Sequence, residues 1–180
     1  MLFSSIPFAF YFLPAVLALY FAVPFRFKNA VLLVFSLVFY GWGEPVYLIL
    51  MTLSILLGWI FGLLIGKYRG TGKATLFITL SLVTSLGLLG WFKYADFVAE
   101  NLNALGLNLP LPQVALPIGI SFYTFQILSY TIDVYRGDVP SQKSLVNFGA
   151  YVSMFPQLIA GPIVRYSDVA RQLEHREHSE

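Results

Sequence analysis

The feature that most constrains this chain is a series of long apolar runs separated by short loops that carry much of its charge. Of its 180 residues, 58% are hydrophobic and only 11% are charged. Soluble domains are about 45–50% apolar and about 25% charged. An apolar run of about 20 residues is long enough to cross a lipid bilayer as a helix. The sequence therefore predicts an all-α integral membrane protein, with the lipid bilayer as a partner that surrounds its helices.

The apolar runs predict about five transmembrane helices. The predicted spans are residues 6–25, 29–42, 46–65, 74–91 and 114–135. The second run is short for a full crossing, so we expect it to include residues 25–27 or to lie tilted. The first run lacks a cationic segment before it and a small-residue cleavage signal. It is therefore interpreted as a retained span and not as a signal peptide.

Two further segments do not fit simple spans. Residues 92–105 place apolar side chains on one helical face and charged or amide side chains on the other, which predicts an interfacial helix lying flat. The apolar stretch at residues 145–164 is interrupted by Pro156 and by Gly161-Pro162. A helix cannot continue unbroken through the second pair. We expect a broken or re-entrant segment there, covered by protein or lining a wet cavity.

Loop charges predict the orientation. The first and third loops carry only basic residues, namely Arg26, Lys28, Lys67, Arg69 and Lys73. The second loop carries only Glu44, and the segment after the fourth span has mixed charge. Because cytoplasmic loops are rich in Lys and Arg, we expect the basic loops and the tail, residues 165–180, to be cytoplasmic. The N-terminus is then extracytoplasmic.

Several kinds of chemistry find no support in the sequence. A net charge of +2 gives no footprint for nucleic acid, and the absence of cysteine excludes thiolate catalysis and cysteine-based metal sites. His175 and His178 lie three residues apart in the charged tail. They could share one helical face, but no third ligand is evident, and a solvated surface is the preferred interpretation. No metal, no bound cofactor and no catalytic residue are predicted for this chain.

The fifth span carries a polar stripe. Gln126, Ser129, Asp133 and Arg136 follow one another at steps of three, four and three, so they share one helical arc. Such side chains do not face hydrocarbon, where a central charge costs about 3 kcal/mol or more. We predict that they line a cavity. For Asp133 and Arg136 the alternative is an ion pair that only anchors the cytoplasmic end of the helix.

Small residues form a second stripe on the third span. Gly58, Gly62 and Gly66 recur every four residues, with Ser54 one turn before them. Such spacing lets two helix backbones approach closely, which is a common driver of packing in lipid. Helix packing is the preferred interpretation. A groove for a lipid or acyl chain is the alternative.

Two longer motifs carry a family resemblance. The residues LPIGISFYTFQ at positions 116–126, continued by YTIDVYRG at 130–137, resemble a block of the membrane-bound O-acyltransferase family. The resemblance is to its branch with the alginate O-acetylation and teichoic acid D-alanyl transfer proteins. The residues FPQLIAGPI at 155–163, followed by Arg165, are similar to the next block. FSS at 3–5, FY at 39–40 and FKY at 92–94 also resemble alginate-type members, so the resemblance covers essentially the whole chain.

The resemblance implies a multi-helix fold with a channel through a thinned centre. It implies transfer of an acyl group, in alginate-type members acetyl, from a cytoplasmic thioester donor toward hydroxyls of an exported polysaccharide such as alginate. It also implies a bacterial inner membrane location and an extracytoplasmic polysaccharide-modifying partner. The second motif block adds Gln157 and Arg165 to the candidate cavity-lining residues. Some relatives carry histidine at the position of Gln157.

One departure from the family pattern affects the expected activity. The family's catalytic histidine lies in the second half of chains more than twice this length, and no position here corresponds to it. We therefore expect this chain to be the N-terminal part of an acyltransferase, inactive without the remaining C-terminal half. The alternative is a non-enzymatic membrane scaffold or transporter half, in which residues 145–164 line a substrate path.

Overall fold

The computed structural model describes residues 5–112, 115–160 and 165–169, and all regular structure in this part of the chain is helical. This confirms the predicted all-α class. In chain order the elements are η1 (Phe8–Phe12), α1 (Leu13–Ala22), α2 (Phe25–Gly43), α3 (Pro45–Lys67), α4 (Gly72–Ala104), α5 (Ile120–Arg136), α6 (Leu145–Ser153) and α7 (Phe155–Ala160). The first of these is a short π-helix that runs directly into α1.

Three of these helices, α2, α3 and α4, are long and apolar enough to cross a membrane. Residues 8–22 form a shorter apolar helix, and α5 has 17 residues. Many large apolar side chains are exposed, for example Val46 and Ile49 on α3 and Val83 on α4. Exposed apolar surface on this scale is typical of a lipid-facing protein. The integral membrane class predicted from composition is therefore confirmed.

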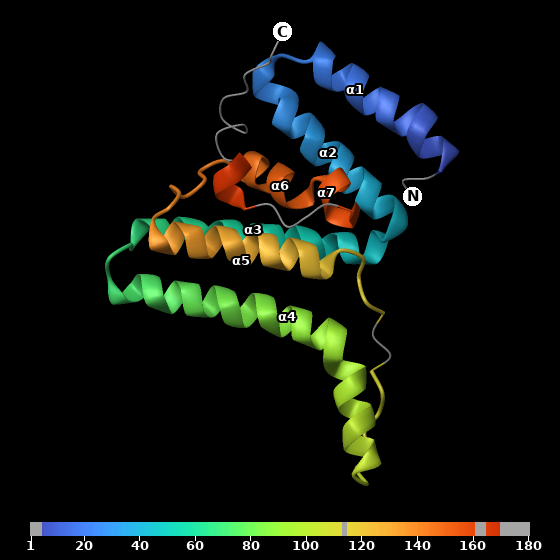
Figure 1. Cartoon of the computed structure of the whole chain (residues 1–180), viewed down its shortest axis with the longest axis vertical. Helices are drawn as coiled ribbons and strands as arrows, with labels where there is room; N and C mark the ends of the chain where they lie inside the picture. Colours follow the sequence, from blue (N-terminus) through green and yellow to red (C-terminus); the bar gives the residue numbers. More distant parts are fainter. Residues whose placement is uncertain (1–4, 113–114, 161–164, 170–180) are drawn as a thin grey trace.

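Helix α3 lies at the centre of the fold (Figure 1). It packs against α5, α4, α2 and α6, while α4 and α5 also pack against each other. Helix α2 crosses over this layer and contacts α6, and α1 lies outermost, against α2. The main core includes buried side chains from α3, α5 and α6, among them Met51, Ile127 and Phe148, and further ones from α2 and α4. A smaller core, mostly of phenylalanine rings, joins η1, α1, α2 and α7.

Prolines mark where several of the helices begin. Helix α2 begins directly after Pro24 and so includes residues 25–27, which gives the short second run 19 residues. Glu44 alone separates α2 from α3, which begins at Pro45. Proline is favoured in the first helical turn because its missing N–H has no intrahelical partner there.

Helix α4 differs from the sequence-based prediction. We expected a span at 74–91 and a separate interfacial helix at 92–105, but the structure has one helix of 33 residues. No Gly-Pro pair or other breaker stands between the two segments, so the hydrogen-bond ladder continues. The last part of α4 nevertheless runs in a different direction from the rest (Figure 1).

Helix α5 begins six residues later than the predicted fifth span. Its N-cap Gly119 has a φ of +76°, and its C-cap Gly137 has a φ of +88°. Both values lie in the left-handed region, which glycine adopts without the steric cost of a Cβ. The two glycines therefore set both ends of the helix, and Pro117 lies in the turn before it.

The segment at 145–164 is broken at Met154, two residues before Pro156, one of the two expected interruptions. Helix α6 ends at Ser153, Met154 is non-helical, and α7 begins at Phe155. Pro156 does not interrupt a helix but occupies the first turn of α7, where a missing N–H is tolerated. Gly161-Pro162 lies outside the described residues.

Candidate functional site

The polar stripe on α5 passes from the interior to the surface along the helix. Gln126 is 2% exposed and Asp133 is 6% exposed. Ser129 is half-buried, and Arg136 is exposed. The two buried members lie on α5, which packs against α3, α4 and α6. The stripe is therefore a candidate site at Gln126 and Asp133, and Arg136 lies at its exposed end.

Several buried polar atoms near this stripe have no hydrogen-bond partner among the described residues. They are Gln126 Oε1, Asp133 Oδ2, Tyr123 OH and Tyr40 OH. Leaving a buried polar group unpaired costs about 1–3 kcal/mol, and folded proteins rarely leave several. Three of the four atoms come from α5 and the fourth from α2. A partner beyond the described residues, whether protein, water or ligand, would relieve this cost.

The carboxylate of Asp133 is not held by Arg136. The described residues contain no ion pair between them, although the charges of Arg165 and Arg136 both act on Asp133. The backbone carbonyl of Asp133 accepts from the N–H groups of Gly137 and Asp138, both at 2.9 Å. Arg69 Nη2 donates to the carbonyl of Arg136 over 3.4 Å. A cation from the α3–α4 loop therefore covers the negative end of α5.

Of the two remaining candidates, Arg165 lies close enough to the buried part of the stripe for its charge to act on Asp133, whereas Gln157 lies on α7. Gln157 is half-buried on α7, and Arg165 is exposed. Helix α7 packs on α2, and the Phe155 ring lies 5.5 Å from Phe39 and 6.0 Å from Phe8. We expected the stripe to face residues 155–163. The described part of α7 instead has its main contact with α2, and residues 161–163 lie outside the described chain.

A buried hydrogen-bond network centred on Gln142 was missed by the sequence analysis. Gln142 is 6% exposed, and its backbone N–H donates to Tyr130 OH at 2.9 Å. Its side-chain amide donates to Tyr166 OH at 2.8 Å and accepts from the Ser144 N–H at 2.9 Å. Its carbonyl accepts from Trp59 Nε1 at 2.9 Å. One loop residue thus joins α3, α5, the start of α6 and the segment at 165–169.

Aromatic rings surround this network. Tyr130 packs 4.6 Å from Phe148 and 4.9 Å from Tyr166, and Tyr166 packs 5.2 Å from Tyr151. All four side chains are almost fully buried. The repeated tyrosines of the C-terminal third were the only signal available in the sequence. Gln142 itself stands in a polar loop, where nothing distinguishes it from its neighbours.

The glycine stripe of α3 lies against α5. A Cβ at Gly58 would come within 2.5 Å of Ile127 Cγ2, and one at Gly62 would overlap the Tyr130 ring. A Cβ at Gly66 would come within 2.6 Å of Ser141 Oγ, in the loop after α5. Absence of side chains at these positions allows the close approach of α3 and α5. This geometry is that of helix packing.

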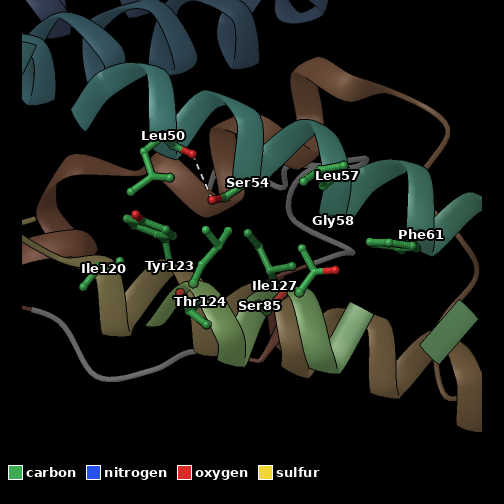
Figure 2. A pocket seen from close by; sticks show the side chains of 12 residues that line it. Leu50, Ser54, Leu57, Gly58, Phe61, Ser85, Ile120, Tyr123, Thr124 and Ile127 are labelled. Atoms are coloured by element: carbon green, nitrogen blue, oxygen red, sulfur yellow. Dashed lines mark hydrogen bonds between the residues drawn. The ribbon is translucent and has the colours of Figure 1, made fainter. Parts of the chain in front are cut away.

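A narrow pocket lies between α3, α4 and α5, beside Gly58 (Figure 2). Ser54, Ser85, Tyr123 and Thr124 supply its polar lining, and the Ser54 hydroxyl donates to the Leu50 carbonyl at 2.9 Å. The cavity volume is about 10 Å³, about the space that one ordered water needs. An acyl chain does not fit, so this pocket gives no support to a groove at the glycine stripe.

Metal binding has no support in the described part of the chain, which contains no group of three His, Cys, Asp or Glu side chains that could hold an ion. His175 and His178 are the only histidines of the sequence and lie outside the described residues. The absence of a metal and of a catalytic residue stays a prediction.

The apolar helices and the buried polar stripe together define a helical integral membrane protein. The chain is 44% identical to the probable alginate O-acetylase AlgI of Azotobacter vinelandii over 185 aligned residues, which cover 99% of this chain and 37% of that protein. It is 43% identical to the AlgI of Pseudomonas aeruginosa, again over 99% of this chain and over 36% of that protein.

A more distant relative is the peptidoglycan O-acetyltransferase of Helicobacter pylori. It is 30% identical over 206 aligned residues, covering 98% of this chain and 39% of that protein. No protein-family model and no solved structure matches the chain. The chain spans a little over a third of the length of the AlgI relatives it matches. The resemblance to the N-terminal portion of alginate-type O-acyltransferases is confirmed.

Proposed function

We propose that this chain is the N-terminal part of a bacterial inner-membrane O-acyltransferase. It would move an acetyl group from a cytoplasmic thioester donor toward hydroxyls of an exported polysaccharide such as alginate. The observation that carries the proposal is the similarity along 99% of the chain to proteins named alginate O-acetylase. The peptidoglycan O-acetyltransferase is a second relative whose acceptor is an extracytoplasmic glycan. An extracytoplasmic polysaccharide-modifying protein would be the partner.

The proposed reaction divides between this chain and the rest of the protein. An acceptor hydroxyl oxygen attacks the thioester carbonyl, the new C–O bond forms, the C–S bond breaks, and the thiol leaves with the donor. A general base takes the hydroxyl proton. The resemblance implies that this base is a histidine in the C-terminal half, and the described residues contain no histidine. This chain would therefore line the channel, and the remaining half of the protein would supply the general base.

The buried polar atoms of α5 support the proposal that this chain lines the channel. Gln126 Oε1 and Asp133 Oδ2 have no hydrogen-bond partner among the described residues. A buried acceptor without a donor is available to a substrate or to side chains of the remaining half. We propose that these atoms face the channel once the C-terminal half is in place.

The test uses the full-length protein of which this chain is the N-terminal part. Gln126→Leu keeps the approximate shape of the side chain but removes its polar atoms, so acetyl transfer should fall at least tenfold while membrane insertion is unchanged. The exposed Lys93→Gln serves as a control with normal transfer. A fully active Gln126→Leu protein would leave α5 as scaffold. The 180-residue chain alone should transfer no acetyl group, and transfer abolished by His175→Ala would contradict its assignment as an incomplete enzyme.

The break at Met154 favours a second candidate function. Helix α6 stops and α7 restarts within one residue in an otherwise apolar segment, and broken helices also line substrate paths in transporters. A scaffold or transporter half is therefore the alternative. The sequence of the longer gene distinguishes the two: a histidine within a downstream apolar span supports the acyltransferase, and an inverted repeat of the first spans supports the transporter.

A further inference from the structure

One end of the α3–α4–α5 layer gathers positive charge. Lys67 ends α3, Arg69 lies in the following turn, and Lys73 stands in the first turn of α4. All three are exposed, and the sequence from 66 to 75 contains no acidic residue. Arg136, at the end of α5, reaches the same place, because its carbonyl accepts from Arg69. The described carboxylates nearby include those of Asp133, on which the Arg136 charge acts, and Asp138, two residues after the end of α5.

The opposite end of the layer has a different charge. The turn between α2 and α3 contains Glu44, and the last third of α4 mixes Lys93 with Asp96 and Glu100. Figure 1 shows that the α3–α4 connection and the α2–α3 connection lie at opposite ends of α3. The positive charge is therefore a property of one end and not of the whole surface.

An open pocket lies at the basic end, with Arg69 in its lining. Its lining includes Arg69, Thr71, Thr75 and Tyr135, and its cavity volume is about 480 Å³. The hydroxyls of Thr75 and Tyr135 lie 3.1 Å apart and join α4 to α5. Lys67 Nζ and Lys73 Nζ do not line the pocket but lie 5.5 Å and 5.3 Å from the centre of the Tyr68 ring, so one aromatic side chain gathers both cations at the α3–α4 connection.

An apolar track leads away from the pocket along α4. Gly72 lines the pocket, and Leu76, Leu80 and Val83 follow at helical spacing and are all exposed. Helices α3 and α4 both qualify as membrane-crossing helices. A headgroup at the pocket would therefore place its acyl chain along these three side chains. A soluble anion would use the cations but not the track.

We propose that the basic pocket at the α3–α4 connection binds the phosphate-bearing headgroup of an anionic phospholipid. Arg69, Thr71 and Thr75 line the pocket and contact the phosphate, and Lys67 and Lys73 beside it at the same α3–α4 connection help neutralise its charge. The exposed track on α4 holds an acyl chain. The site does not depend on the acyltransferase proposal, since it uses no residue of the polar stripe's buried part.

The test compares lipids on the purified chain in a neutral detergent. Phosphatidylglycerol should raise the thermal unfolding temperature in a saturable way, while phosphatidylcholine with the same acyl chains should not. Each cation near a bilayer surface changes binding about fivefold, so Lys67→Gln with Lys73→Gln should weaken the apparent affinity by about 25-fold. Added salt should weaken it further, as expected for screened charges.

Lys93→Gln is the matched control, because Lys93 also stacks on a tyrosine, 5.6 Å from the ring centre of Tyr94, at the other end of α4. It should bind phosphatidylglycerol as the unaltered chain does. Equal stabilisation by the two lipids, or an equal loss in Lys93→Gln, overturns the proposal. Equal stabilisation by inorganic phosphate would show that the pocket takes a soluble anion and not a lipid.

Discussion

At the scale of single residues, the contact between Gly62 and Tyr130 joins two features of this protein. The Tyr130 ring occupies the space that a side chain at Gly62 would take. Its hydroxyl is held in turn by the Gln142 N–H, so the ring cannot move away without breaking a buried hydrogen bond. A small residue on α3 and a polar residue in a loop therefore depend on the same tyrosine.

Gly62→Ala should lower the stability of the chain by about 1–3 kcal/mol, as overpacking of a dense core does. Thermal unfolding in detergent measures the effect. Gly87→Ala is the control, because no atom lies within 4 Å of a Cβ added at this position on α4. Alanine in an exposed helix position should stabilise by about 0.5–1 kcal/mol. Equal unfolding temperatures for the two variants would contradict the close approach of α3 and α5.

At the scale of elements, the loop between α5 and α6 organises more structure than its length suggests. Gln142 contacts groups on both sides of the loop and also the Tyr166 hydroxyl, which belongs to the short helical turn after α7. The loop therefore holds in place the segment that carries Arg165. Within this segment the Asp168 N–H also donates to the Arg165 carbonyl at 3.1 Å.

Gln142→Leu should loosen that segment, because it removes the hydrogen bonds of the Gln142 side chain with the Tyr166 hydroxyl and the Ser144 N–H, and losing a buried hydrogen bond costs about 1–3 kcal/mol. Hydrogen–deuterium exchange of a peptide covering residues 165–169 should become faster, while exchange in α4 stays unchanged. Lys143→Leu, an exposed change one position away, is the control and should leave both rates unaltered. Unchanged exchange at 165–169 in Gln142→Leu would mean that the aromatic packing alone holds the segment.

Some features of these helices and loops could be predicted from the sequence, and others could not. Apolar runs bounded by Pro, Gly and charged loops predicted the helices, because those residues act locally. The continuity of α4 was missed because the change from apolar to amphipathic pattern at residue 92 is not itself a helix breaker. The interruption expected at Pro156 falls two residues earlier, at Met154, because proline fits in the first turn of the helix that follows. Gln142 was missed because its function arises only from contacts between distant segments.

At the scale of the whole molecule, charge predicts how the chain lies in the membrane. The absence of cysteine makes site-directed labelling direct. Thr71→Cys should react with a membrane-impermeant maleimide only after the cells are opened, whereas Glu44→Cys should react in intact cells. Thr71 is preferable to Gly70, whose φ of +82° disfavours any side chain. Labelling of Thr71→Cys from outside would reverse the predicted orientation.

The length of α4 gives the molecule an internal measure of bilayer thickness. The 20 residue-to-residue steps from Lys73 to Lys93 span about 30 Å of helix axis, which equals the hydrocarbon depth of an ordinary bilayer, about 30 Å. Trp91, exposed two residues before Lys93, is of the type that settles at a membrane surface. The membrane boundaries then fall near these two lysines. The last part of α4 bends away from the rest of the helix in Figure 1, and with these boundaries we expect its last 11 residues to lie outside the hydrocarbon.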